Sequence, residues 1–279
     1  GLLPVLKAWW SARRKLRTRL ERKNVDIVHI HSATRWSWKR KVGLIRIAQS
    51  FGVPIVLSLH SGDFDRHCQE RGPEVNRICS NVHTVVLTEQ WQNKLSTWLG
   101  PSSVIPNPVP KVNVNKERDR NQFILLGRSN PMKGQEIAID AIRQLRKQGF
   151  DVTLNLTGMT LNEPGIVGHG WVDGKMKEHL MNTCGTLLSP SEWEGLSMSV
   201  IEAMARGMPV IASHASAGVF DKSGMIVDRD SESLQSAMKQ MVEGDLWDKM
   251  ANFGPVEAER YSLEKVIPLW KKLYDEVTQ

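Results

Sequence analysis

Residues Ser189–Ser213, SPSEWEGLSMSVIEAMARGMPVIAS, join the end of an apolar strand to a polar loop and a helix. Apolar residues recur at helical spacing after Ser197 until Gly207 and Pro209, which predict the end of the helix. The first N–H groups of such a helix, together with the helix dipole, favour an anion such as a diphosphate. The stretch therefore predicts an α/β protein with an anion-binding loop at the carboxyl end of a strand.

Two carboxylates, Glu194 and Glu202, lie in this stretch. A carboxylate repels phosphate but accepts hydrogen bonds from neutral hydroxyl groups. We therefore expect Glu202 to bind a ribose and Glu194 to bind a sugar ring beside the phosphates. The alternative is an ordinary solvated first helical turn, where glutamate is common. The expected donors to a diphosphate are the backbone N–H groups of Gly195, Leu196, Ser197 and Met198.

A second motif lies upstream in LLGRSNPMKG, residues 125–134, where an apolar strand runs into Gly127 and Arg128. A helix is predicted to follow Lys133 and Gly134. Arginine can bind a phosphate through two N–H groups, and lysine supplies a point charge. Arg128 and Lys133 can therefore converge on one anion, although each alone would be an ordinary surface cation.

Together, these motifs resemble the donor half of a GT-B glycosyltransferase of retaining family 4. The resemblance extends more weakly to DIVHIHS (26–32), PIVLSLHSGDF (54–64), VVLTE (85–89) and VIPNPV (104–109), which are similar to the amino-terminal strands of the family. The residues that match the two donor motifs are Gly127, Arg128, Pro131, Lys133 and Gly134, and Pro190, Ser191, Glu194, Gly195, Glu202, Ala203, Met204, Ala205, Gly207, Pro209 and Val210.

The resemblance implies an enzyme that moves a sugar from a UDP- or GDP-linked donor to an acceptor hydroxyl with retained anomeric configuration, without a metal or a cofactor. The basic first lobe favours a glycan or lipid-linked acceptor, as in bacterial envelope polysaccharide or glycolipid assembly. The alternative is a non-catalytic nucleotide-sugar-binding or scaffolding subunit of a membrane-associated glycan assembly complex. The implied catalytic residues are His60, Arg128, Lys133 and Glu194. The implied donor-binding residues are Gly127, Arg128, Lys133, Glu194, Gly195, Leu196, Ser197, Met198 and Glu202.

The acceptor side is expected to include His31 and Ser61. His60 follows a predicted strand, and its alternative role is structural, because histidine can satisfy both ring nitrogens with backbone partners. His29 and His31 alternate along one strand and share a face. A metal pair is an alternative there, but no Cys, Asp or Glu at ligand spacing completes such a site.

Strand and helix patterns alternate along the chain, which predicts parallel sheets in two Rossmann-like lobes. We expect an amino-terminal lobe over 1–112, a nucleotide-sugar lobe over 113–261, and a helix over 262–279 that crosses back to the first lobe. Seven strands are predicted, near residues 25–30, 54–59, 83–88, 122–127, 152–157, 185–188 and 208–212, with a linker over Pro106–Asn121.

The first lobe is expected to be incomplete, because the glycine-rich turn that usually precedes the strand at 26–32 in the family is absent from this sequence. Three explanations stay open: a trimmed chain, a naturally minimal enzyme, or a partner that supplies the missing part.

Charge is unevenly divided within the net value of +7. Residues 1–111 hold 18 Lys and Arg against 7 Asp and Glu (+11), and residues 112–279 hold 19 against 23 (−4). Lys7–Lys23 alone holds eight basic residues, one acid and the pair Trp9 and Trp10. This pattern predicts a surface for anionic lipid, with a solvated helix face as the alternative. No nucleic-acid-binding motif accompanies it.

No run of 18 apolar residues and no signal peptide is found, so we expect a cytoplasmic protein, with peripheral attachment to the inner face of the membrane as an open alternative. Cys68, Cys79 and Cys184 are odd in number and irregularly spaced, which predicts reduced, structural thiols. Trp171 and Trp193 are candidates to stack on a base or a sugar. The sequence makes no prediction of the oligomeric state.

Overall fold

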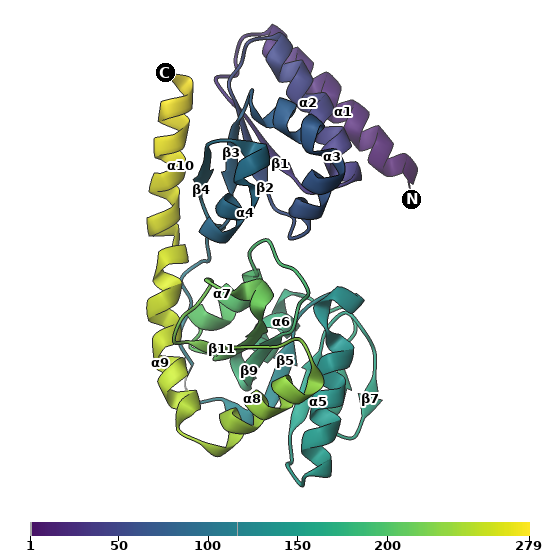
Figure 1. Cartoon of the computed structure of the whole chain (residues 1–279), viewed down its shortest axis with the longest axis vertical. Helices are drawn as coiled ribbons and strands as arrows, with labels where there is room; N and C mark the ends of the chain where they lie inside the picture. Colours follow the sequence, from purple (N-terminus) through teal and green to yellow (C-terminus); the bar gives the residue numbers. More distant parts are fainter. Residues whose placement is uncertain (1, 116) are drawn as a thin grey trace. The chain divides into compact units, whose positions relative to one another are not determined.

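The computed structural model describes residues 2–115 and 117–279, which form two compact units (Figure 1). The smaller unit takes in Gly1–Asn107 and Val266–Gln279, and the larger unit takes in Pro108–Lys265. Gly1 and Lys116 lie outside the described residues, and Lys116 falls within the predicted linker. The two-lobe α/β architecture expected from the sequence is confirmed.

The smaller unit is built on a parallel sheet of order β1-β2-β3-β4. Its strands are short, and a helix lies in each crossover between them, as parallel pairing requires. The strands are β1 (Val28–Ser32), β2 (Ile55–Leu59), β3 (His83–Val86) and β4 (Ser102–Val104). The helices are α1 (Leu2–Glu21), α2 (Trp36–Ser50), α3 (Phe64–Cys79), α4 (Glu89–Leu99) and, from the end of the chain, α10 (Leu263–Thr278).

Helix α10 returns to the smaller unit through an apolar face. Its buried residues Val266, Leu273 and Val277 pack with Val56 of β2 and Val85 of β3. A helix over 262–279 was predicted, and two of its apolar residues are exposed. Ile267 and Leu269 keep 45% and 42% of their surface, because the buried stripe follows positions 266, 273 and 277 instead.

The larger unit is built on a seven-stranded sheet of order β11-β10-β9-β5-β6-β8-β7, in which only the β7–β8 pair is antiparallel. The strands are β5 (Asp119–Leu125), β6 (Thr153–Leu156), β7 (Asn162–Glu163), β8 (Ile166–Gly168), β9 (Cys184–Ser189), β10 (Val210–Ser213) and β11 (Gly224–Val227). The α-helices are α5 (Gln135–Lys147), α6 (Gly174–Thr183), α7 (Met198–Ala205), α8 (Ser231–Glu243) and α9 (Leu246–Ala258). Three 3₁₀ helices are η1 (Pro131–Lys133), η2 (His214–Ser216) and η3 (Glu259–Tyr261).

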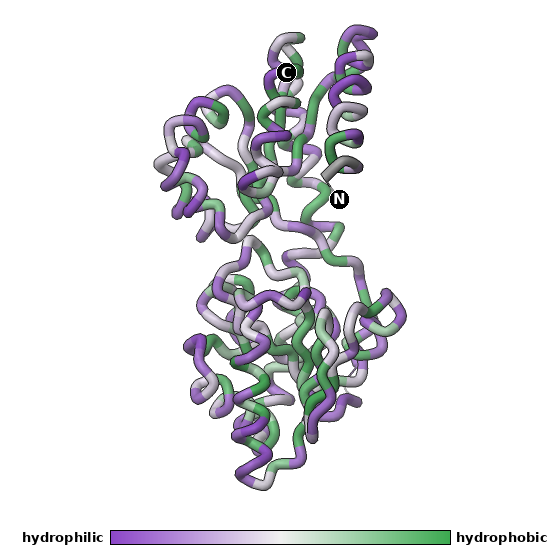
Figure 2. The backbone as a smooth tube through the Cα atoms, turned by 90° about the vertical axis from the view of Figure 1, so that its right-hand side faces the viewer, coloured by the Kyte–Doolittle hydropathy of each residue, from purple (hydrophilic) through white to green (hydrophobic). Residues whose placement is uncertain are grey.

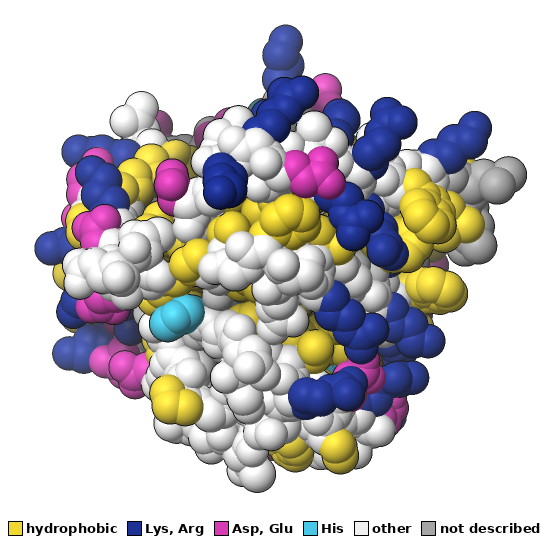
Figure 3. All heavy atoms as spheres, turned by 90° about the horizontal axis from the view of Figure 1, so that it is seen from above, with side chains coloured by type: hydrophobic (Ala, Val, Ile, Leu, Met, Phe, Trp, Pro, Cys, Tyr) yellow, Lys and Arg dark blue, Asp and Glu magenta, His cyan; other side chains and the backbone are white. Residues whose placement is uncertain are grey.

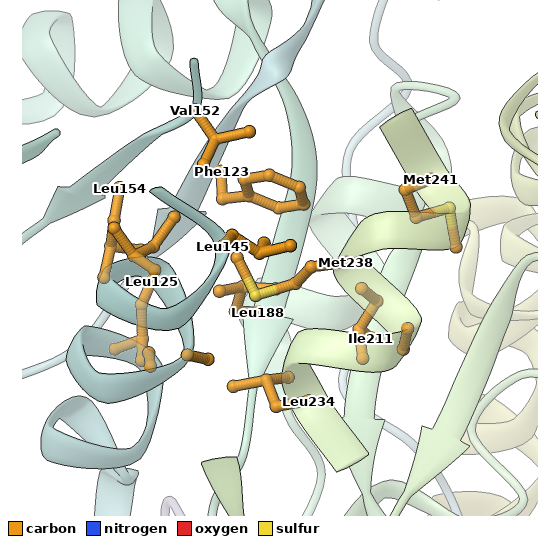
Figure 4. Close-up of a cluster of buried hydrophobic side chains, with 14 of the residues drawn as sticks. Phe123, Leu125, Leu145, Val152, Leu154, Leu188, Ile211, Leu234, Met238 and Met241 are labelled. Carbon is orange, nitrogen blue, oxygen red and sulfur yellow. The ribbon is translucent and has the colours of Figure 1, made fainter. Parts of the chain in front are cut away.

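The core of this unit lies between the central strands and the helices α5 and α8 (Figure 4). Phe123 of β5 and Leu188 of β9 meet Leu145 of α5 and Met238 of α8, and all four are almost fully buried. Each such side chain contributes about 1.5–3 kcal/mol of transfer free energy. In Figure 2, the hydrophobic colouring is concentrated in the central strands of this unit. This packing fixes the ends of β5 and β9, from which both sequence motifs continue.

The seven strands predicted from the sequence are present, and β4, β7, β8 and β11 were missed because they are short or only half-buried. The predicted linker was three residues too long. Asp119, Arg120 and Asn121 are polar, but they form the solvent-facing start of β5.

Within the described residues, no helix is both long and apolar enough to span a membrane. The three cysteines are free thiols in buried positions, and burial is the main cause that raises the pKa of Cys68, Cys79 and Cys184 to about 12. These positions agree with a structural role.

Candidate functional site

Both sequence motifs lie at one edge of the larger sheet. Strands β5 and β9 are parallel neighbours, so Gly127, which follows β5, and Pro190, which follows β9, leave the sheet at its carboxyl edge. Ligands of open α/β sheets bind at this edge. The first motif continues through η1 to Lys133, and the second continues through a loop to α7.

The two motif loops are fixed to each other by backbone contacts. Glu192 N–H donates to the Met132 carbonyl over 2.8 Å. Gly134 adopts φ 72°, and a Cβ at this position would lie closer than 3.0 Å to the Pro190 carbonyl oxygen and side chain. Only glycine fits both the left-handed backbone and this close approach.

Arg229, which lies between β11 and α8, connects the same loops through its guanidinium. Its Nε donates to the Pro190 carbonyl over 3.1 Å, and one terminal nitrogen donates to the Pro131 carbonyl over 2.8 Å. The planar donor fork of arginine suits two acceptors at fixed positions. Sequence reasoning missed this residue, since nothing in VDRDSES marks its arginine as a bridge.

Lys133 and Glu194 form an ion pair across the two loops. The Lys133 Nζ to Glu194 Oε1 distance is 2.6 Å, and the Ser191 hydroxyl donates to the same oxygen over 2.8 Å. Both charged side chains are largely shielded from solvent, so screening by water is weaker than at a surface pair. The lysine ammonium has three N–H donors, and Glu194 accepts one of them.

Glu202 forms a second ion pair, with Lys177 of α6. The Lys177 Nζ to Glu202 Oε2 distance is 2.5 Å. Glu202 lies in the second turn of α7. The Arg206 side chain donates to the backbone carbonyl of Glu202 over 3.1 Å. Sequence analysis missed Lys177, which sits on a solvent-facing helix with no motif around it. Its position four residues after the capping Asp173 is the only local signal.

A pocket of about 320 Å³ opens beside these groups in the larger unit. Two cations, Arg128 and Lys177, reach it, and none of its lining residues is acidic. Trp171 contributes to the wall with 80% of its surface exposed, so one face of the indole is free for a flat partner. The lining residues are Leu126, Gly127, Arg128, Thr157, Gly158, Trp171, Val172 and Lys177.

Within the part of the chain that the structure describes, the start of α7 has no side-chain capping bond, as is also true of α2, α3, α5 and α9, whereas three other helices are capped. Thr88, Asp173 and Asp230 each accept a backbone N–H in the first turn of α4, α6 and α8. Ser197 holds the same N-cap position before α7, but its side chain makes no capping bond with the described residues. The backbone N–H groups at the start of α7 therefore receive no bond from the cap side chain. These are the groups expected to bind a diphosphate, those of Gly195, Leu196, Ser197 and Met198.

The predicted residues of the smaller unit gather at the carboxyl ends of β1 and β2. His31 Nδ1 lies 2.7 Å from His60 Nε2, so one imidazole donates and the other accepts. His29 stacks beside His31 with ring centroids 4.2 Å apart. The two nitrogens of His29 are bonded to Ser58 Oγ and Tyr274 Oη, both at 2.7 Å.

The three imidazoles favour the neutral form. Burial is the main cause that lowers the pKa of His29, to about 4, and the neighbouring His31 and His60 lower it further. Burial also lowers the pKa of His60, with His31 as the second cause. The pKa of His31 is lowered by burial and then by Lys41. A positive charge anywhere in the cluster is therefore disfavoured.

Ser61 and the unpredicted Asp63 complete this end of the sheet. The hydroxyls of Ser61 and Thr34 donate to Asp63 Oδ1 over 2.5 and 3.1 Å. Asp63 also holds the N-cap position of α3. An acid directly before a helix could have been singled out from the sequence, but its two hydroxyl donors come together only through the pairing of β1 with β2.

The described residues contain no cluster of three or more His, Cys, Asp or Glu side chains suited to a metal ion. The proposed pair of His29 and His31 does not point at a shared centre, because His29 uses both nitrogens on Ser58 and Tyr274.

A larger cavity of about 1370 Å³ in the smaller unit lies at the opposite edge of its sheet. Its wall includes Ile55, His83 and Ser102, the first residues of β2, β3 and β4. The chemistry-bearing side chains His60 and Ser61 do not line it, and parallel sheets bind ligands at the other edge. The larger volume of this cavity therefore does not identify it as the functional site.

Each of the two units matches a model of a known protein family. Residues 2–111 match the family model of Glycosyltransferase Family 4, and residues 120–244 match the model of Glycosyl transferases group 1. An uncharacterized glycosyltransferase of Methanocaldococcus jannaschii is 23% identical over 283 residues, covering 93% of this chain and 78% of that protein. The phosphatidyl-myo-inositol mannosyltransferase of Mycobacterium leprae is 24% identical over 281 residues, covering 90% of this chain and 74% of its own length.

A solved structure shares the fold. Anabaena HepE in complex with UDP and glucose matches with a TM-score of 0.77 at 17% identity, covering 94% of this chain and 80% of that one. The GT-B fold expected from the sequence is thereby confirmed. Since the two family models between them take in most of both units, the chain belongs to the glycosyltransferases of the GT-B fold, in family 4 and group 1.

Proposed function

We propose that the chain transfers a sugar from a UDP- or GDP-linked donor to an acceptor hydroxyl, with the anomeric configuration retained. The observation that carries the proposal is the gathering of two lysine–glutamate pairs, Lys133–Glu194 and Lys177–Glu202, at the carboxyl edge of one sheet. Cations for phosphate and carboxylates for hydroxyls are both needed to bind a nucleoside diphosphate sugar. The donor complexes named among the solved relatives support this substrate class.

The diphosphate is assigned to Arg128, Lys133 and the amides at the start of α7. Lys133 keeps N–H donors beyond the one that Glu194 accepts, and Glu194 holds the ammonium in place. The amides at the start of α7 add donors and the positive end of the helix dipole. Glu202 is assigned to the ribose hydroxyls and Glu194 to the sugar ring.

The proposed reaction needs no protein nucleophile. The bond between the anomeric carbon and the diphosphate oxygen breaks while the acceptor oxygen bonds to the same face of the sugar. The acceptor proton passes to the leaving diphosphate. Arg128, Lys133 and the amides stabilise the charge on that leaving group. Glu194 is engaged by Lys133 and Ser191, which suits a positioning role better than attack on the sugar.

His60 is assigned to the donor sugar, and His31 and Ser61 to the acceptor side. Neutral imidazoles and hydroxyls suit the recognition of sugar hydroxyl groups, since each can donate and accept. We assign the acceptor to the glycan or lipid-linked class of envelope polysaccharide or glycolipid assembly. The phosphatidyl-myo-inositol substrate in the name of the Mycobacterium leprae relative supports a lipid-linked acceptor.

The test is calorimetric titration of UDP, GDP, ADP and their sugar conjugates, first without metal and then with magnesium. We expect one nucleotide to bind without metal, and Glu202→Ala to weaken it by at least about tenfold through the lost ribose bonds. Glu232→Ala, an exposed acid in the first turn of α8, is the matched control and should bind as wild type does.

Equal binding by the Glu202→Ala and Glu232→Ala variants would contradict the ribose assignment. Binding with no transfer to any glycan or lipid-linked acceptor would favour the non-catalytic subunit. Absence of binding by all nucleotides would refute the proposed donor site.

A further inference from the structure

The excess positive charge of the smaller unit is concentrated on two neighbouring helices. Helices α1 and α2 hold ten Lys and Arg residues and one acid. By contrast, α3 and α10 each hold three basic and three acidic residues, and α4 holds one of each. The excess is therefore a local property of one surface and not a general feature of the unit.

Helix α1 presents an exposed aromatic side chain within a row of cations. Trp10 keeps 62% of its surface exposed. Lys7, Arg14 and Arg17 stand three residues before it and four and seven residues after it, so they share its helical face, and all three are exposed. Trp9 is half-buried, its indole N–H donates to the Arg40 carbonyl of α2 over 3.2 Å, and its ring centroid lies 5.4 Å from that of Trp10. Of the two tryptophans in the predicted lipid-binding stretch, Trp10 is therefore the exposed one.

Helix α2 supplies a second exposed tryptophan that the sequence analysis did not single out. Trp36 keeps 64% of its surface exposed, and Lys39 Nζ lies 5.5 Å from the centre of its ring. The bond from Trp9 to Arg40, one turn beyond Trp36, makes the two helices direct neighbours. Figure 3 shows one face of the molecule on which Lys and Arg side chains gather beside hydrophobic ones. We call Lys7, Trp10, Arg14, Arg17, Trp36 and Lys39 the basic face.

We propose that the basic face binds the surface of an anionic lipid bilayer. Indole rings partition into the interface between headgroups and acyl chains, while lysine and arginine attract the anionic headgroups. Two exposed tryptophans that are each accompanied by cations combine both contributions. A single-stranded nucleic acid would instead need a charged groove with stacking rings, and neither of the two pockets described above is lined by residues of the basic face. The proposal does not depend on the proposed transfer reaction.

The experiment is co-sedimentation of the chain with vesicles of phosphatidylcholine alone and with added phosphatidylglycerol. We expect binding to the anionic vesicles only, and its loss at about 1 M salt, where the Debye length is about 3 Å. Because each basic residue near the surface changes affinity about fivefold, the triple variant Lys7→Glu, Arg14→Glu, Arg17→Glu should bind at least about tenfold more weakly. Trp10→Ser with Trp36→Ser should weaken binding several-fold at unchanged charge.

A matched control removes another cation–aromatic pair. Lys222 Nζ lies 5.4 Å from the ring centre of the exposed Phe253 in the larger unit, and Lys222→Glu with Phe253→Ser should leave vesicle binding unchanged. Thermal melts followed by circular dichroism confirm that each variant is folded. The proposal is overturned if the chain binds neither vesicle, if it binds both equally, or if the triple variant binds like the control. Salt-sensitive binding to heparin without vesicle binding would assign the face to another polyanion.

Discussion

The candidate donor site of the larger unit and the histidine cluster of the smaller unit both lie at the carboxyl ends of parallel strands. In the donor site, opposite charges pair across loops, as Lys133 does with Glu194. In the histidine cluster, neutral groups share hydrogen bonds, as His31 does with His60. Ion-paired side chains stay charged and can exchange partners with an incoming anion. The hydrogen bonds between neutral imidazole rings depend on pH instead.

The largest expected effect comes from removing the cation of the donor site. Lys133→Ala should lower sugar transfer by about two orders of magnitude or more, because one lost charge-stabilising donor in a transition state costs about 3 kcal/mol. Steady-state rates with the identified donor measure it. Lys147→Ala, at the exposed end of α5, is the control. A Lys133→Ala rate within about threefold of the control would remove Lys133 from the charge-stabilising role.

The contact between the motif loops can be broken at Gly134. Gly134→Ala should lower the free energy of unfolding by about 2–3 kcal/mol, because it adds a clash with Pro190 to a left-handed backbone strain. Gly149→Ala isolates the strain alone, since Gly149 has φ 92° and open space around its Cβ position. Urea denaturation measures both. Equal losses in the two variants would show that the close approach to Pro190 contributes nothing.

Arg229 tests how far the donor site depends on the position of its loops. It bonds to both motif loops but is not a member of either lysine–glutamate pair. Arg229→Gln should raise KM for the donor by about tenfold with a smaller change in kcat, since it loosens the Pro131 and Pro190 loops. Arg143→Gln removes an exposed arginine bonded to Glu163 and serves as the control. A fall in kcat with KM unchanged would instead implicate Arg229 in the transition state.

The histidine cluster should reveal itself through pH. The folded-state pKa of His29 is about 4, below its ordinary value of 6.5, so the unfolded chain binds a proton first as pH falls. Stability is therefore fully present above about pH 6.5 and declines as pH falls towards about 4. His29→Gln should flatten that decline in thermal melts. His83→Gln, at an exposed histidine of the same unit, controls for loss of an imidazole. Parallel pH curves for wild type and His29→Gln would contradict this source of pH dependence.

The residues of the candidate site that were predicted share one property: each belongs to a short motif that begins at the end of a strand. Lys133 and Glu194 each belong to a local motif with turn glycines beside it, so spacing was enough to find them. Lys177 and Arg229 were missed because each acts from another element, through a 2.5 Å ion pair and two carbonyl contacts. Asp63 was visible as an acid before a helix, but its partners Thr34 and Ser61 were not.

The sequence by itself determined the parallel α/β class, because hydrophobic periodicity and turn residues act over short stretches of chain, and the resemblance of its two motifs indicated the family. Tertiary structure alone decided which charges pair, that Trp9 is half-buried while Trp36 stays exposed, and that Tyr274 of α10 meets His29 of β1. Those contacts join residues far apart along the chain. They form only when buried side chains fix the packing of whole strands and helices against one another, and no local pattern encodes that arrangement.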